Sequence, residues 1–200
     1  MANPDTPYGL QPTNRNGGEY DGQVNVYFIP ATDGTAIAVG DPVTLAGSAD
    51  ADGIPTIKRL TAGSTSASAA NIPVGVVVGF AVNPQNLSVP NYRAASTSAY
   101  VLVADDPNLF FAVQEDSVGG ALAATNVGQR INFIMGTPSA TTGLSNVEID
   151  SNTAAATADL QAQIIRLLPV PNNVIGTNAK WICKFNAHLY AGSAFGAAGV

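Results

Sequence analysis

Apolar and polar residues alternate along the chain in short runs, which Gly, Pro, Asp and Asn interrupt. The clearest stretch is Tyr100–Gln114, in which two apolar runs of strand length flank Asp105-Asp106-Pro107-Asn108. Proline fixes φ in such a turn, and Asp and Asn side chains can bond to their own backbone. The flanks are rich in β-branched and aromatic residues, so we predict two adjacent strands near the middle of one β-rich domain. Their pairing is an inference, because the turn can also lead the chain into a different sheet.

Further short strands are predicted on both sides of this stretch, because apolar runs of similar length recur between turn residues. The expected strands are residues 23–29, 36–39, 43–45, 54–60, 72–82, 130–135, 147–149, 159–168 and 181–190. Short strands with Gly, Pro and Asp between them are typical of a β-sandwich or barrel.

The residues of two segments can be interpreted as either a helix or a strand. Residues 72–82 are too few to span a bilayer and too β-branched for a helix, so we expect a strand buried on both faces, with bends or bulges at Gly75 and Gly79. Residues 154–168 contain alanine and apolar residues spaced by four, which favour a helix. Polar and apolar residues also alternate there, and we predict a strand over residues 159–168.

The ends of the chain differ from its middle. Pro and Gly are frequent in residues 1–22, and such a segment is either a frayed terminus or an arm that becomes ordered on a neighbouring subunit. The candidate anchors of such an arm are Tyr8, Leu10 and Tyr20. We expect an extended arm (1–22), a β-rich core (23–190) and a flexible tail of small residues (191–200). The predicted fold is all-β, an antiparallel β-sandwich or barrel (jelly-roll-like or β-tulip-like) with long loops.

Catalytic groups are scarce. The chain has one histidine, His188, and one cysteine, Cys183, which lie five residues apart on one predicted strand. An odd separation places them on opposite faces, so a Cys–His nucleophile is disfavoured and we expect a half-exposed histidine and a buried cysteine. A zinc site needs about four such ligands. One cysteine allows no intrachain disulfide.

The acidic residues are explained more simply by turns than by chemistry. Asp105-Asp106 and Glu115-Asp116 are carboxylate pairs of the kind that hydrolyse glycosides, but both lie at predicted turns or strand ends. Residues 48–53 resemble part of a calcium loop, yet Arg59 stands where the loop needs a glutamate. There is no phosphate-binding or dinucleotide motif. We therefore expect no enzyme activity, no cofactor and no metal.

The composition is unusually poor in charge. Only 11% of the 200 residues are charged, against about 25% in ordinary globular chains. An uncharged polar surface costs little to desolvate, which suits a protein packed against partners, although a soluble β-domain with a neutral polar surface fits equally well. The net charge of −6 argues against nucleic acid as a direct partner. We found no signal peptide and no membrane-length apolar run, so we expect synthesis in the cytoplasm.

Several segments carry a resemblance to a known family. They are Pro7–Pro12, Gly22–Ala31, Val39–Val43, Val74–Phe80, Tyr100–Pro107, Gln114–Gly120 and Ala179–Trp181. No single motif is specific, but their order resembles that in the cement, or decoration, proteins of tailed-bacteriophage heads, and it covers most of the chain.

The resemblance implies a β-rich subunit, usually a homotrimer, on the outer surface of the expanded capsid. Such a subunit would bind at three-fold positions and clamp adjacent major capsid proteins. The resemblance identifies no catalytic or contact residues in this sequence. Two alternatives stay open: another virion component, such as a head fibre base or tail protein, and a soluble carbohydrate-binding β-sandwich. A carbohydrate site needs exposed aromatic residues beside Asp or Asn residues, and we expect Asn91-Tyr92-Arg93 to be the only such patch.

Overall fold

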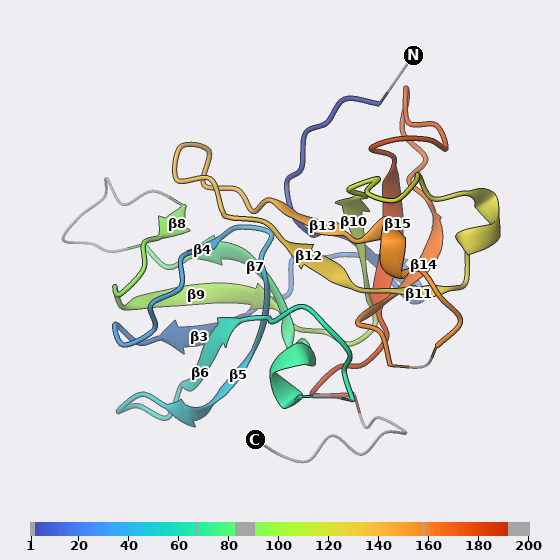
Figure 1. The fold of residues 1–200 in the computed structure, drawn as a ribbon. Coiled ribbons are helices and arrows are strands. Elements are labelled where there is room, and N and C mark those ends of the chain that lie inside the picture. Colours follow the sequence, from blue (N-terminus) through green and yellow to red (C-terminus); the bar gives the residue numbers. More distant parts are fainter. Residues whose placement is uncertain (1–2, 67, 83–90, 158, 192–200) are drawn as a thin grey trace.

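The computed structural model describes residues 3–66, 68–82, 91–157 and 159–191. Within these ranges the regular elements are β-strands and three short 3-10 turns, η1 (Ala69–Asn71), η2 (Ala124–Asn126) and η3 (Ser151–Thr153). The strands form antiparallel sheets and a closed barrel (Figure 1). The all-β prediction is confirmed.

Five strands close into the barrel. In order around it they are β3 (Asn25–Ile29), β6 (Pro55–Arg59), β5 (Pro42–Ala49), β7 (Gly75–Phe80) and β9 (Ala99–Ala104). All neighbours pair antiparallel except β3 and β6, which meet in parallel at Phe28 and Thr56. Successive side chains point to opposite faces, so Tyr27 and Ile29 are buried inside while Val26 is exposed.

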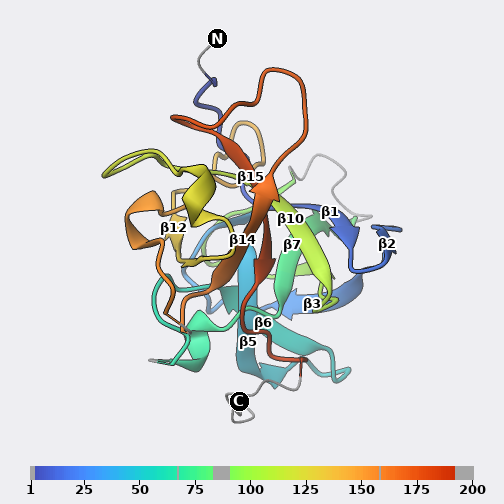
Figure 2. The ribbon, with the colours of Figure 1, turned by 90° about the vertical axis from the view of Figure 1, so that its right-hand side faces the viewer.

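A six-stranded sheet lies beside the barrel (Figure 2). Its order is β11 (Arg130–Ile131), β14 (Ala162–Leu167), β15 (Lys180–Phe185), β10 (Leu109–Gln114), β1 (Gln11–Arg15) and β2 (Gly18–Glu19). Two short pairs complete the fold, β12 (Phe133–Met135) with β13 (Val147–Ile149) and β4 (Ile37–Ala38) with β8 (Tyr92–Arg93).

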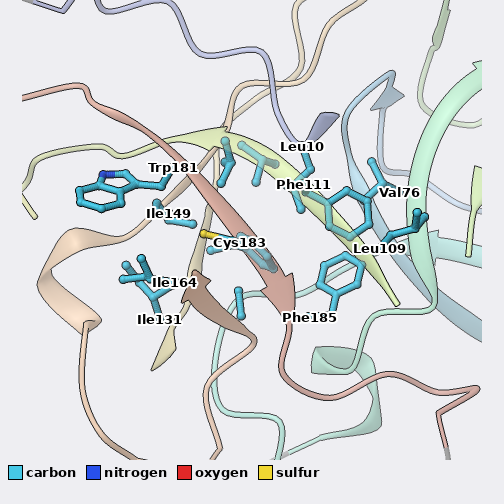
Figure 3. Close-up of a cluster of buried hydrophobic side chains, with 14 of the residues drawn as sticks. Leu10, Val76, Leu109, Phe111, Ile131, Ile149, Ile164, Trp181, Cys183 and Phe185 are labelled. Carbon is cyan, nitrogen blue, oxygen red and sulfur yellow. The ribbon is translucent and has the colours of Figure 1, made fainter. Parts of the chain in front are cut away.

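The sheet and the barrel share one hydrophobic core. Phe111, Trp181 and other residues of the sheet pack in the same cluster as Val76 and Ala104 of the barrel (Figure 3). A second cluster, centred on Tyr27 and the inward-facing valines, fills the barrel itself. The two bodies are therefore packed into one unit.

A buried carboxylate joins the barrel to the segment that carries β12 and β13. Asp41 precedes β5 and has no solvent exposure. It accepts hydrogen bonds from Arg59 Nη2 at 2.8 Å, Ser145 Oγ at 2.7 Å and the Ala38 backbone N–H at 2.8 Å. Arg59 also donates to the carbonyl of Gly136. Ser145 and Gly136 lie in the segment that carries β12 and β13, so this ion pair connects that segment to the barrel.

The strands that flank Asp105-Asp106-Pro107-Asn108 do not pair with each other, and the inferred pairing is wrong. β9 pairs with β3 and β7 in the barrel, whereas β10 pairs with β1 and β15 in the sheet. The turn itself forms, with the Leu109 N–H donating to the Asp106 carbonyl at 3.1 Å. A tight turn fixes only local geometry, and here it passes the chain from one sheet to the other.

The two difficult segments are strands, as predicted. β14 covers Ala162–Leu167, so the alternating pattern outweighed the helix propensity of alanine. In β7 the register shifts between Val77 and Gly79, which confirms a bulge at the second glycine. Gly75 instead marks a close approach of two backbones, because a Cβ there would lie 2.5 Å from the Ala104 carbonyl oxygen.

The last strand is shorter than predicted. Trp181, Cys183 and Phe185 face the core as expected, but β15 ends at Phe185 rather than continuing to residue 190. The chain then turns inward, and His188 is 2% exposed. The expectation of a half-exposed strand histidine is therefore wrong, while the expectation of a buried cysteine is confirmed.

The N-terminal segment folds onto its own chain. β1 pairs with β10 from Gln11↔Ala112 to Arg15↔Leu109. Leu10 is 1% exposed in the shared core, and its N–H donates to the Gly40 carbonyl at 2.9 Å. Residues 10–15 are therefore part of the fold of their own chain. Residues 192–200 of the expected tail lie outside the described residues.

Two glycines of β7 provide a matched test of the close packing. Neither has a positive φ, so only the available space differs. Gly75→Ala places a Cβ 2.6 Å from Val103 Cγ1, whereas at Gly79 the nearest atom is Leu102 Cδ1 at 3.6 Å. We expect Gly75→Ala to lower the free energy of unfolding by about 2–3 kcal/mol. Gly79→Ala should change it by less than about 1 kcal/mol. Equilibrium denaturation measures both, and equal losses would contradict the packing argument.

Candidate functional site: the apical loops

Two loops project from the end of the six-stranded sheet where the described chain begins (Figures 1 and 2). We call residues 116–121, after β10, and residues 168–178, between β14 and β15, the apical loops. They carry four exposed large hydrophobic side chains, Val118 (61% exposed), Val170 (43%), Val174 (53%) and Ile175 (48%). Exposed apolar side chains on two loops that are linked to each other make these loops a candidate contact surface for another macromolecule.

The longer apical loop is closed at its base by one asparagine. Asn173 Nδ2 donates to the carbonyls of Leu168 and Lys180, each at 2.8 Å. Its Oδ1 accepts the Lys180 N–H at 2.9 Å. These bonds link the end of β14 to the start of β15, so the exposed residues beyond Asn173 are presented from a fixed base.

The N-terminus fastens the tip of the same loop. Asn3 is buried, and its Nδ2 donates to the carbonyls of Val174 and Thr177, each at 2.9 Å. Its Oδ1 accepts the Val174 N–H at 3.1 Å. Ser117 of the shorter loop accepts the Asn178 N–H at 2.8 Å, which joins the two apical loops.

A buried amide supports the N-terminal segment from below. Gln114 has no exposure, and its Nε2 donates to Asp5 Oδ1 and Glu148 Oε1, each at 2.9 Å. Its Oε1 accepts the Thr6 N–H at 3.0 Å. Burial raises the pKa of Glu148, and the hydrogen bond from Gln114 partly offsets that rise.

A second buried carboxylate lies at the base of the apical loops. Glu115 accepts the Leu122 N–H at 2.6 Å and the Ala179 N–H at 3.4 Å. Burial is the largest cause that raises the pKa of Glu115, which reaches about 7, and the nearby charge of Asp116 adds to the rise. Asp116 Oδ1 in turn accepts the backbone N–H and the hydroxyl of Ser151. This part of the structure therefore changes its charge near neutral pH.

The three anchors predicted from sequence do not lie on one surface. Tyr8 is partly buried beneath Lys180, whose Nζ lies 5.2 Å from the ring centre, and burial raises the pKa of Tyr8 to about 12. Leu10 is buried in the shared core. Tyr20 donates to the Gln23 carbonyl at 3.1 Å, and its hydroxyl pKa is raised by burial and by Asp21 and Asp105.

The other patches noted in the sequence have structural roles. Arg93 of Asn91-Tyr92-Arg93 is buried, and it donates to the carbonyls of Pro30 at 3.0 Å and Asp33 at 2.7 Å. Asp50 accepts the N–H groups of Asp52 and Ile54, so residues 50–54 form the plain turn that was predicted. Burial raises the pKa of the Cys183 thiol.

Among the described residues, no three or more His, Cys, Asp or Glu side chains are grouped so as to hold a metal ion. The same part of the chain contains no helix with the length and hydrophobicity to cross a membrane.

The sequence pattern did not reveal the apical loops. Val174 and Ile175 stand between Asn-Asn and Gly-Thr-Asn, in a composition that indicates a loop. A pair of β-branched residues inside such a loop is the one signal that was available, since apolar residues in loops are commonly buried or bound. Asn3, Gln114 and Asn173 gave no signal, because their partners are distant in sequence.

Comparisons with protein-family models, with curated proteins and with solved structures gave no match for this chain. Its function is therefore argued from its own residues.

We expect the Glu115 carboxyl to make stability depend on pH. Its pKa rises from 4.5 to about 7 on folding, so the folded state favours the protonated form and the free energy of unfolding falls as pH rises between these values. Glu115→Gln removes the titration. The difference in free energy of unfolding, variant minus wild type, should therefore increase by up to about 3 kcal/mol across this window, at 1.36 kcal/mol per pKa unit.

Denaturant unfolding from pH 4 to pH 8 measures that difference. Glu19→Gln removes an exposed carboxylate of β2 and controls for the loss of one negative charge. A Glu115→Gln difference that stays constant with pH would contradict the assignment. His188, whose pKa burial lowers to about 4, titrates in both proteins and cancels in the comparison.

Proposed function

We propose that this chain is a structural virion protein, a capsid cement or decoration protein. In this proposal it binds the outer surface of a tailed-phage head, as a homotrimer, and clamps adjacent major capsid proteins. The order of segments that resembles this family supports the proposal. The all-β fold is of the kind that the resemblance implies.

The proposal rests mainly on the exposed apolar side chains of the apical loops. Val118, Val170, Val174 and Ile175 are exposed on loops that hydrogen bonds hold together. The central part of a protein–protein interface is apolar and poor in charge, and its rim is polar. With 11% charged residues in the whole chain, a partner that covers these loops desolvates few charges.

The hydrogen bonds that hold the apical loops in place also favour binding. Ordering a mobile loop on a partner reduces affinity, whereas a loop already held in place avoids much of that cost. Asn3 and Asn173 hold the longer loop before any partner arrives. On a shell that carries many copies, modest contacts at several subunits add through avidity.

We expect the double variant Val174→Asp, Ile175→Asp to lose attachment to the shell. Two carboxylates on the exposed loop would have to be desolvated on binding, so the apparent affinity should fall at least tenfold. Co-sedimentation with decoration-free heads of the source phage measures attachment. The melting temperature should stay close to that of wild type, because both positions are exposed.

The matched control is Val127→Asp. Val127 is 45% exposed between η2 and β11, outside the apical loops. It should attach as wild type does. If the double variant attaches normally, the apical loops are not the contact surface, and they no longer support the proposed function.

Electron cryo-microscopy of particles distinguishes the alternatives. Density outside the shell at three-fold positions supports the cement role. Density confined to the tail or to fibres assigns the chain to another virion component, and absence from particles removes the virion proposal.

A further inference from the structure

A cleft of about 440 Å³ lies at the other end of β15 from the apical loops. The apical loop 168–178 leads into β15, and the chain reaches the cleft at Tyr190, beyond the end of that strand. Residues from three segments of the barrel complete the lining, which consists of Asn25, Val26, Tyr27, Pro55, Asp105, Pro107 and Tyr190.

One carboxylate organises the polar side of the cleft. Both oxygens of Asp105 accept from Asn25 Nδ2 at 3.0 Å, and Oδ2 accepts from the Tyr27 hydroxyl at 2.6 Å. The hydroxyl oxygens of Tyr27 and Tyr190 lie 3.2 Å apart. Tyr27 is buried in the barrel core, so the carboxylate is held by a rigid side chain.

Tyr190 is also supported from behind. His188 Nδ1 accepts the Tyr190 backbone N–H at 3.1 Å, and the two rings are 6.1 Å apart. Yet Tyr190 as a whole residue remains 48% exposed. The cleft thus combines fixed polar groups with an exposed aromatic residue.

We propose that this cleft binds a neutral saccharide. A sugar ring presents hydroxyl groups along its edge and C–H groups on its faces, and it needs polar and apolar partners in one place. Asp105, with about four lone-pair positions of which three are in use, retains capacity to accept a hydroxyl group. Tyr190 and Val26 offer apolar surface for the ring, beside the prolines at positions 55 and 107.

The charge and size of the cleft narrow the ligand class. A phosphate or an acidic sugar would be repelled by the carboxylate of Asp105, which lines the cleft. The volume lies in the range of about 300–1,000 Å³ that is typical of small-molecule sites, enough for one or two sugar units. Among the described residues Asp105 is the only carboxylate in the lining, whereas glycoside hydrolysis uses two, so we infer binding without cleavage.

The position of the cleft is compatible with the proposed virion role. A subunit held to a shell through its apical loops would present the opposite end, with the cleft, away from that shell. The saccharide proposal rests on the lining residues alone and does not require the virion proposal.

The test uses the full chain and a panel of neutral methyl hexosides, the glucoside, galactoside and mannoside. Saturation-transfer NMR detects weak binding, and titration gives the dissociation constant. We expect at least one hexoside to bind at millimolar concentration, and Tyr190→Ala to weaken that binding at least tenfold. Asp105→Asn keeps the shape of the side chain and should also weaken binding, because a hydroxyl acceptor loses its charge.

Tyr100→Ala is the matched control. Tyr100 is exposed on β9 and donates to Asp50 Oδ2 at 2.8 Å, so it forms the same kind of Tyr–Asp pair outside the cleft. It should bind the hexoside within twofold of wild type. Melting curves verify that each variant is folded. If Tyr190→Ala does not fold, Tyr190→Phe takes its place in the test, because it removes only the hydroxyl group.

Three results would overturn the proposal: no binding of any neutral hexoside, equal loss in Tyr100→Ala and Tyr190→Ala, or a preference for sialic acid over the neutral sugars. Failure of the apical-loop variants to change head attachment would leave this proposal intact, and loss of hexoside binding would leave the virion proposal intact.

Discussion

The structure depends on a carboxylate that is buried where the barrel meets the rest of the chain. Burial raises the pKa of Asp41, and the charge of Arg59 is the strongest influence that opposes this rise. A buried ion pair that loses one partner costs about 3–5 kcal/mol. The donors to Asp41 come from residues 38, 59 and 145, so three segments distant in sequence must meet before that cost is avoided. This requirement fixes how the β12–β13 segment sits on the barrel.

The crossing of the chain from the barrel to the six-stranded sheet explains why the two ends of the molecule differ. Because β9 belongs to the barrel and β10 to the sheet, the chain crosses between them at residues 105–108. One end of the sheet carries the apical loops, which are held by asparagine side chains and by the N-terminus. The other end carries Asp105, which the crossing places beside Tyr27. Two surfaces of different chemistry, one apolar and one polar with an aromatic wall, follow from a single topology.

The anchor residues predicted from the sequence illustrate what local patterns miss. Tyr8, Leu10 and Tyr20 were chosen because isolated apolar residues in a Pro- and Gly-rich segment suggested contacts with a neighbour. Their contacts are instead within the chain, because β10 offers an edge that β1 completes. The Asp105 turn was predicted correctly, but its hydrogen-bond partners Asn25 and Tyr27 lie 80 and 78 residues before it, and no spacing rule connects them.

The sequence by itself determined the local elements. Period-two alternation and β-branched residues placed strands such as β3, β14 and β15, since side-chain direction is a property of neighbouring residues. Only the tertiary structure decided which strands pair, that residues 3–22 belong to the fold, and that His188 is buried. Those outcomes depend on unpaired strand edges and on space in the hydrophobic core, both of which distant segments supply. The pattern of neighbouring residues does not reveal either of them.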